Sequence, residues 1–354
     1  MGQSSLLLNF AVVGVSLVLA VLTYLLVERP IKKNRRRLPK GWQPVAVACG
    51  VSTVLLFAGH FYQQTPADVK SARAQLLKDL WPDLERLETK RELDPCFARL
   101  DGSIDAACRA NAVHMGLLIG DSHAGKWYEG IRGPAAKADV RLISLVQNGC
   151  DPSLIENSHR CLSRFDRSLR EASTFGLKPD FAILGAAWNR FFFGRGWRAD
   201  KTISRSDHDR FVKRLTDSIA LLEERGIKRF LLIGPVPEFA VEAPICLQRA
   251  IFTGRTSEIC SVQRRVVDQR RKFAVGGLRR VAQANANVRF IDPIEVFCDS
   301  RRCQPRNASG VSYTDDNHLS THGSRSVYRY YAKTFEWAMG VAEVEAKGAR
   351  LVRP

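Results

Sequence analysis

The sequence lacks several motifs that would by themselves assign a function. No CxxC pair occurs among its nine cysteines, which argues against a structural zinc site. No glycine-rich phosphate-binding loop is present, so nothing supports a nucleotide-dependent enzyme. The composition, 45% hydrophobic and 25% charged, excludes a disordered, collagen-like or small disulfide-scaffold chain. We therefore expect a folded protein with no bound metal and no resident cofactor.

Charge is almost missing from the beginning of the chain. The first 28 residues carry one charge, Glu28, and seven basic residues follow between Arg29 and Lys40. These account for six of the eighteen net positive charges, which leaves +12 on the rest. Residues 6–27 form an uncharged run long enough, at about 1.5 Å per residue, to cross a bilayer core. A second, shorter uncharged run covers 44–62, and together they predict a transmembrane hairpin.

Each apolar run has an alternative interpretation. The first could be a secretory signal peptide, but it has no positively charged n-region, its apolar core is too long, and no small-x-small cleavage site follows Val27. The second could be a buried core helix, because Gly50, Ser52 and Thr53 dilute its apolar character. We favour the two membrane helices.

The loop between the two runs predicts the orientation of the chain. Residues 28–43 are short and strongly basic, so the positive-inside rule places them in the cytoplasm. Both ends of the hairpin then face outward. We expect anchoring in a bacterial inner membrane, with everything after residue 62 in the periplasm. There, residues 63–112 are predicted to form a stalk or linker.

The cysteines are consistent with that placement. Cys49 lies in the second apolar run, and eight cysteines remain in the outer part. An even number in an oxidising compartment suggests disulfides, although many connectivities are possible. Free or zinc-bound thiols are the alternative. Grouping into sequence-local couples favours four bridges: Cys96–Cys108, Cys150–Cys161, Cys246–Cys260 and Cys298–Cys303.

The outer part alternates short apolar runs with amphipathic helical stretches. Helices are expected at 207–225, 261–285 and 321–339. Uniformly apolar strands between such helices predict a parallel sheet covered on both faces. We expect a three-layer α/β/α sandwich over residues 113–343, flavodoxin-like, followed by a tail at 344–354. The five predicted strands are 115–119, 141–146, 181–184, 230–233 and 288–291.

Residues just after the strands are the candidates for chemistry, because ligands bind beyond the carboxyl ends of such a sheet. Ser122 follows the first strand, at a turn where the next helix offers backbone N–H groups to an oxyanion. A serine nucleophile needs a base, and His318 is the best candidate. Asp315 lies three residues before it, so a turn can bring its carboxylate onto the imidazole. The alternatives are an ordinary turn aspartate and a surface histidine.

These motifs carry a resemblance to a known family. Gly120-Asp121-Ser122 and the later Asp315-x-x-His318 resemble the first and last blocks of the SGNH (GDSL-like) hydrolase superfamily, over about residues 113–343. Residues 24–33 are similar to the end of the last core helix of the membrane acyltransferase-three family. In one branch of that family a basic loop, one more helix and a periplasmic SGNH domain follow. Since the earlier core helices are lacking, we expect a fragment, a mis-started reading frame or one half of a split system.

The resemblance implies serine O-acylation, usually O-acetylation, of a glycan such as lipopolysaccharide O-antigen, exopolysaccharide or peptidoglycan. It implies that Ser122 is the acylated nucleophile, His318 the general base and acid, and Asp315 the orienting carboxylate. The oxyanion donors would be the backbone N–H groups of Ser122 and Gly149 and the side chain of Asn189. The acyl group would come ultimately from acetyl-CoA, through a membrane core that this chain lacks.

Three further residues are candidates on weaker grounds. Asn189 lies four residues after Gly185, whereas the family's third block has its glycine and asparagine two apart. Trp188 begins an aromatic and basic stretch, 188–198, suited to sugar stacking and acidic groups; the alternative is that these aromatics tuck under the sheet. His123 could contact substrate or be a structural histidine.

The partners expected are a glycan acceptor, the membrane and a separate or missing acyltransferase core. The +12 charge suits an acidic glycan or an anionic lipid surface. Periplasmic placement argues against nucleic acid. Two other functions stay open at this point. A carbohydrate acetylesterase would use the same triad with water as acceptor, and a glycan-binding subunit would keep the fold without catalysis.

Overall fold

The computed structural model describes residues 96, 108, 114–147, 149–150, 152–154, 159–174, 178–194, 202–252 and 255–341, with a few isolated residues before residue 30. The chain divides into two compact units, Met1–Leu76 and Leu77–Pro354. Every labelled strand and helix below belongs to the second unit.

The predicted membrane helices, 6–27 and 44–62, lie almost entirely outside the described residues, as do most of the linker 63–112 and all of the tail 344–354. In the part of the chain that is described, no helix has both the length and the apolar character needed to cross a bilayer. The hairpin, its orientation and the domain limits therefore stay predictions.

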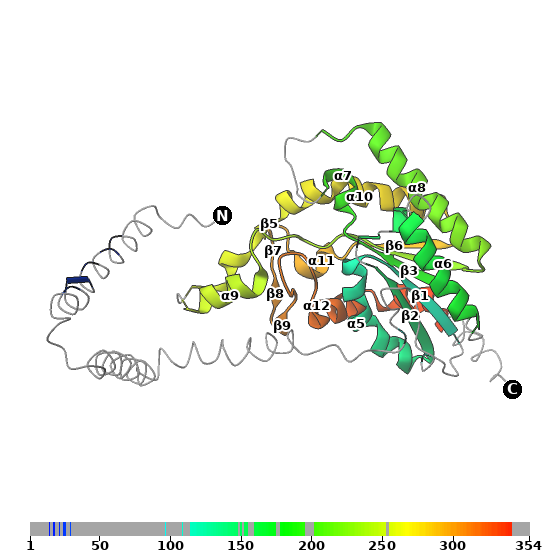
Figure 1. Cartoon of the computed structure of the whole chain (residues 1–354), viewed down its shortest axis with the longest axis horizontal. Coiled ribbons are helices and arrows are strands. Elements are labelled where there is room, and N and C mark those ends of the chain that lie inside the picture. Colours follow the sequence, from blue (N-terminus) through cyan, green and yellow to red (C-terminus); the bar gives the residue numbers. More distant parts are fainter. Residues whose placement is uncertain are drawn as a thin grey trace. The chain divides into compact units, whose positions relative to one another are not determined.

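The core of the second unit is a five-stranded parallel sheet, as the sequence predicts (Figure 1). Its strands are ordered β2-β1-β3-β4-β6 and all neighbours run parallel. The bounds are β1 His114–Gly120, β2 Val140–Val146, β3 Phe181–Gly185, β4 Arg229–Ile233 and β6 Val288–Ile291. Two short antiparallel pairs were not expected: β5 Val262–Gln263 with β7 Arg302–Cys303, and β8 Arg306–Asn307 with β9 Gly310–Val311.

Helices cover both faces of this sheet, which confirms the α/β/α sandwich (Figure 1). The predicted helix at 321–339 is interrupted at Tyr331 and forms two helices. The full set is α5 Ser122–Lys137, α6 His159–Thr174, α7 Asn189–Phe193, α8 Arg205–Glu224, α9 Ala243–Phe252, α10 Arg264–Ala284, α11 Ile294–Phe297, α12 Thr321–Tyr330 and α13 Ala332–Met339, with 3-10 turns η3 Pro152–Leu154 and η4 Ser257–Cys260.

Alternation along each strand separates two apolar clusters. Leu117 and Ile119 point to the face covered by α8 and α10, where they join Phe211 and Leu278. Leu118 points to the opposite face, which α5, α12 and α13 cover. Because side chains of a strand alternate between faces, a strand buried on both sides must be apolar throughout. This is why the runs in the sequence read as uniformly hydrophobic.

The four predicted disulfides form, and the proposed pairing is confirmed. Cys150–Cys161 ties the loop after β2 to α6, and Cys246–Cys260 ties α9 to η4. Cys298–Cys303 joins the residue after α11 to β7. The bridge Cys96–Cys108 is fully buried. Covalent ties of this kind restrict the unfolded chain and hold loops that carry little core of their own.

The packing of α12 on α5 brings distant parts of the sequence together. Gly130 of α5 lies so close to α12 that an added Cβ would sit 2.0 Å from Ser324 Oγ. Ser324 Oγ in turn donates to the Trp127 carbonyl at 3.1 Å. Since α5 begins at Ser122 and α12 begins three residues after His318, this close approach brings the two helix beginnings side by side.

Candidate active site

The first element of the site is the turn between β1 and α5, which carries Ser122. Gly120 pairs with Gly185 of β3, and a Cβ on Gly120 would lie 1.8 Å from the Gly185 carbonyl oxygen. Asp121 is buried, and its two carboxylate oxygens accept hydrogen bonds from the backbone N–H of His123 at 2.9 Å and of Ala187 at 3.0 Å. The turn is thus fixed both to its own helix and to the loop after β3.

The second element is the loop before α12, which carries His318 and Asp315. Ser122 Oγ lies 2.9 Å from His318 Nε2, across 196 residues of sequence. His318 Nδ1 lies 2.7 Å from Asp315 Oδ2. The structure therefore brings the three predicted triad residues together in a hydrogen-bonded series. This geometry suits proton transfer from the serine to an imidazole oriented by a carboxylate.

Main-chain hydrogen bonds fix the shape of this loop. Asp315 Oδ1 accepts from the N–H groups of Asn317 at 2.9 Å and of His318 at 2.7 Å. The loop is closed where the Thr314 N–H donates to the His318 carbonyl at 2.9 Å. Ser320 caps α12 by accepting from the Gly323 N–H at 3.1 Å. The Asp-x-x-His spacing is thus the geometry of a capped turn, and it delivers the carboxylate to the imidazole.

The connection after β4 and the first residue of α9 support the same loop from outside. The Phe239 N–H donates to the Asp316 carbonyl at 2.8 Å, and the Ala243 N–H donates to the Asp315 carbonyl at 3.1 Å. This support was not predicted, because backbone contacts leave no residue-type signal in a sequence.

The site favours an ionised carboxylate at Asp315. Burial opposes the charge, but hydrogen bonds from the His318 side chain and from the N–H groups of Asn317 and His318 outweigh it and lower the pKa of Asp315 to about 2. An anionic Asp315 holds a proton on His318 Nδ1, which leaves Nε2 free to accept the proton of Ser122.

The structure corrects the prediction for Trp188. Its side chain is 1% exposed, its Nε1 donates to the Ile233 carbonyl at 2.7 Å, and its ring packs against Phe211. No ring face is free to stack on a sugar, because the residue belongs to the core. Phe192 is also buried, so the described part of the stretch, 188–194, follows the alternative of aromatics packed under the sheet. Residues 195–198 lie outside the described residues.

The predicted oxyanion donors stay predictions. Asn189 opens α7 and is buried, and its Nδ2 donates to Glu238 Oε1 at 3.1 Å. That bond uses one of its two amide protons. Gly149 has φ +79, a left-handed conformation that favours glycine, in the turn after β2.

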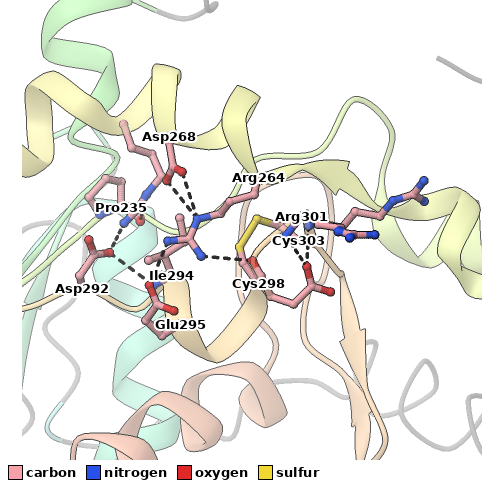
Figure 2. Close-up of polar contacts among 12 residues, drawn as sticks. Pro235, Arg264, Asp268, Asp292, Ile294, Glu295, Cys298, Arg301 and Cys303 are labelled. Carbon is pink, nitrogen blue, oxygen red and sulfur yellow. Dashed lines mark hydrogen bonds and ion pairs between the residues drawn. A yellow bond between two sulfur atoms is a disulfide. The ribbon is translucent and has the colours of Figure 1, made fainter.

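The reasoning from sequence missed an ion pair that joins the ends of β4 and β6. Arg271 of α10 is 3% exposed, pairs with Asp292 directly after β6, and donates to the Pro235 carbonyl at 2.7 Å. Asp292 also accepts from the Ile294 N–H at 3.4 Å (Figure 2). An arginine within an otherwise amphipathic helix gives no sequence signal of such a contact. In the described residues, no group of three metal-ligating side chains is placed to hold an ion.

Two solved structures are similar to part of this chain. One is the periplasmic domain of a lipopolysaccharide acetyltransferase from Salmonella ser. Paratyphi A, with 15% identity, a TM-score of 0.48, and coverage of 77% of this chain and 98% of that chain. The other is an acetyl xylan esterase from the rumen bacterium Butyrivibrio proteoclasticus, with 10% identity, a TM-score of 0.37, and coverage of 66% of each chain. At these values neither likeness bears on the function of this chain.

The comparison with curated proteins gives no match. The family comparison is decisive, because one family model matches residues 93–333, which is more than half of the chain. The model describes an SGNH domain fused to AT3 domains, and the similarity of residues 24–33 to the acyltransferase-three core lies outside the matched region. By this match the chain belongs to the family of SGNH domains that occur fused to AT3 domains.

Proposed function

We propose that this protein is a membrane-anchored serine O-acyltransferase that passes an acyl group, most simply acetyl, to a hydroxyl of a cell-surface glycan. The observation that carries the proposal is the series Ser122 Oγ, His318 Nε2, His318 Nδ1 and Asp315 Oδ2, with separations of 2.9 and 2.7 Å between its hydrogen-bonded atoms. A non-catalytic glycan-binding subunit would not need this alignment. Membership of a family fused to AT3 domains supports acyl transfer as the reaction.

The first half of the reaction acylates the serine. Ser122 Oγ attacks the carbonyl carbon of the acyl donor while its proton passes to His318 Nε2. Asp315 stabilises the imidazolium that forms. Backbone N–H groups of Ser122 and Gly149 and the Asn189 amide are the proposed donors to the oxyanion. When the tetrahedral intermediate collapses, His318 returns the proton to the leaving group, and Ser122 carries the acyl ester.

The second half transfers the acyl group to the glycan. A sugar hydroxyl attacks the ester carbonyl and gives its proton to His318 Nε2. Collapse breaks the bond to Ser122 Oγ, which takes that proton back, so the enzyme is regenerated and an acylated sugar leaves. If water replaces the sugar, the same steps give an acetylesterase. The two outcomes differ in whether the acceptor excludes water from the acyl-enzyme.

The proposed setting is the periplasmic side of a bacterial inner membrane. Four disulfides fit an oxidising compartment, and the predicted hairpin supplies the anchor. The donor would be acyl groups that originate from acetyl-CoA and are delivered by a membrane acyltransferase core. The acceptor would be lipopolysaccharide O-antigen, exopolysaccharide or peptidoglycan.

The test compares the purified full-length chain with its Ser122→Ala variant, using an activated acetyl ester and candidate glycans. We expect the variant to lose about 10⁴-fold or more in acetate release and in glycan acetylation, because the nucleophile is gone. Ser173→Ala is the matched control, since Ser173 is exposed on α6 and its hydroxyl donates to the Leu169 carbonyl in the preceding turn. Equal activity of the two serine variants would contradict the enzymatic proposal. Acetate release without acetylated glycan would identify the protein as an esterase.

A further inference from the structure

One buried histidine beside the triad is unused by the mechanism above. His123 follows Ser122 directly, at the second position of α5. Its ring centroid lies 4.5 Å from that of His318, with the planes inclined by 38°. The residue is 8% exposed, and its Nε2 atom is closed off from solvent and has no hydrogen-bond partner among the described residues. A buried polar atom left unpaired costs stability, so this placement needs an explanation.

The surroundings keep this histidine uncharged. Burial is the largest cause and lowers the pKa of His123 to about 4. The charged or titratable groups that face it are Asp121 in the preceding turn, Arg190 of α7, and Asp315 and His318 in the loop before α12. The two carboxylates favour the protonated form, and Arg190 and His318 oppose it. The ring of His123 is therefore uncharged near pH 7.

The hydrogen bonds of His318 leave the faces of its ring unsupported. Hydrogen bonds at ring nitrogens are directed in the ring plane, so those to Ser122 at Nε2 and to Asp315 at Nδ1 place no group against a ring face. A side chain packed on a face restricts torsion of the ring about its Cβ–Cγ bond, which would redirect Nε2 away from Ser122. The ring of His123 is close enough to supply that packing.

We infer that His123 is a positioning residue: it is the uncharged ring against which His318 is held while His318 takes and returns the proton of Ser122. The inference rests on one part of the proposed function, the activation of Ser122 by His318. A neutral neighbour adds no repulsion when His318 becomes an imidazolium, whereas a cation at the same place would oppose that state. The solvent-inaccessible Nε2 of His123 also argues against the predicted direct contact with substrate.

The experiment measures how fast a fluorophosphonate reagent labels Ser122 in the purified full-length chain near neutral pH. This reagent reports on the serine and its base, and needs neither a glycan nor an acyl donor. Four variants are compared with the wild type: His123→Phe, His123→Ala, His123→Met and His123→Lys. Thermal unfolding of each variant identifies any that fail to fold, and Ser122→Ala gives the background.

The phenylalanine and alanine variants test the packing role. We expect His123→Ala to lower the maximal labelling rate by about 30- to 100-fold with unchanged reagent binding, because a loosened base is misplaced. His123→Phe keeps a neutral ring and should stay within about threefold of the wild type. A fast alanine variant, or a phenylalanine variant as slow as alanine, would overturn the inference.

The lysine and methionine variants test the charge. Their side chains have similar length, so they differ mainly in the ammonium group. We expect His123→Lys to label at least about tenfold more slowly than His123→Met near neutral pH. Equal rates would remove the electrostatic part of the inference. A wild-type chain that labels well at Ser122 but never acylates a glycan would refute the proposed transfer and leave the role of His123 intact.

Discussion

The two ends of the parallel sheet use carboxylates in different ways. At the carboxyl ends, Asp121, Asp292 and Asp315 each accept at least one hydrogen bond from a backbone N–H group. At the amino ends, Asp166 pairs with Arg225 at 2.9 Å and Asp180 pairs with Arg229 at 3.5 Å. Asp121 and Asp315 belong to the candidate site, and Asp166 and Asp180 line an open groove at the opposite edge.

This difference concerns how firmly each carboxylate is oriented. A backbone N–H has a fixed position once the fold forms, so a carboxylate bound to it is held in one orientation. An arginine side chain has several rotatable bonds and orients a carboxylate less firmly. The partly exposed pair of Asp166 and Arg225 should contribute about 1 kcal/mol or less to stability. Orientation at the carboxyl edge is what a hydroxyl nucleophile and its base require.

The largest effect should come from Asp315. In Asp315→Asn the amide cannot balance the imidazolium or hold the required proton on His318 Nδ1, so kcat should fall by about 10³- to 10⁴-fold. The Asn oxygen can still accept from the N–H groups of Asn317 and His318, so the melting temperature should change little. Acetate release and thermal unfolding measure the two expectations. Asp316→Asn is the neighbouring control, and equal loss in both variants would contradict the assignment of Asp315.

The next largest effect should come from the buried ion pair between Arg271 and Asp292. Arg271→Leu should reduce the free energy of unfolding by about 3 kcal/mol, because the largely buried Asp292 carboxylate and the Pro235 carbonyl lose their partner. Chemical denaturation of the full chain measures this. Arg279→Leu removes an exposed arginine that approaches the same carboxylate at 3.4 Å, and it should cost far less. Similar losses in the two variants would show that burial of Arg271 is unimportant.

A pH dependence of stability follows from His123. The unfolded chain binds a proton at this residue below about pH 6.5, whereas the folded chain binds it only below about pH 4, so stability falls as pH drops between these values. The loss should be roughly 3 kcal/mol and should be absent in His123→Phe. Denaturant midpoints of both chains, measured across this range, give the difference. Parallel curves for the two chains would contradict a buried neutral His123.

Asp315 affects stability in a separate and more acidic pH range than His123 does. Its folded pKa of about 2 lies below the ordinary value of 3.8, so it stabilises the fold above that ordinary value, and the contribution is lost as pH falls toward 2. The two residues can therefore be separated by pH alone. A stability loss already complete above pH 4 in His123→Phe would contradict this separation.

The smallest effect should come from the pair of Asp166 and Arg225, at the amino ends of the strands. Asp166→Asn breaks the pair with Arg225, and we expect a change in the free energy of unfolding below about 1 kcal/mol with unchanged acetate release. Added salt should make the change in the free energy of unfolding still smaller. A larger loss of stability or activity would show that the two edges of the sheet are less different than their carboxylates suggest.

Much of this molecule could be predicted from local sequence patterns. Strands buried on both faces must be apolar, so their runs were visible, and the short spacing within each cysteine couple predicted the four disulfides that form. The Asp-x-x-His turn was visible because three residues suffice to bring Asp315 onto His318. These features depend on neighbours along the chain, which a sequence displays directly.

Contacts between distant residues were decided by the tertiary structure. Trp188 could be an exposed sugar platform or a core side chain, and only the packing of α8 against the sheet made it core. His123 and His318 are far apart in the sequence, and their rings come together because α5 packs closely on α12 at Gly130. Sequence by itself therefore determined the strands, the cysteine couples and the candidate residues of the site. The packing of helices onto the sheet determined which of them meet, because burial and proximity are properties of the whole fold.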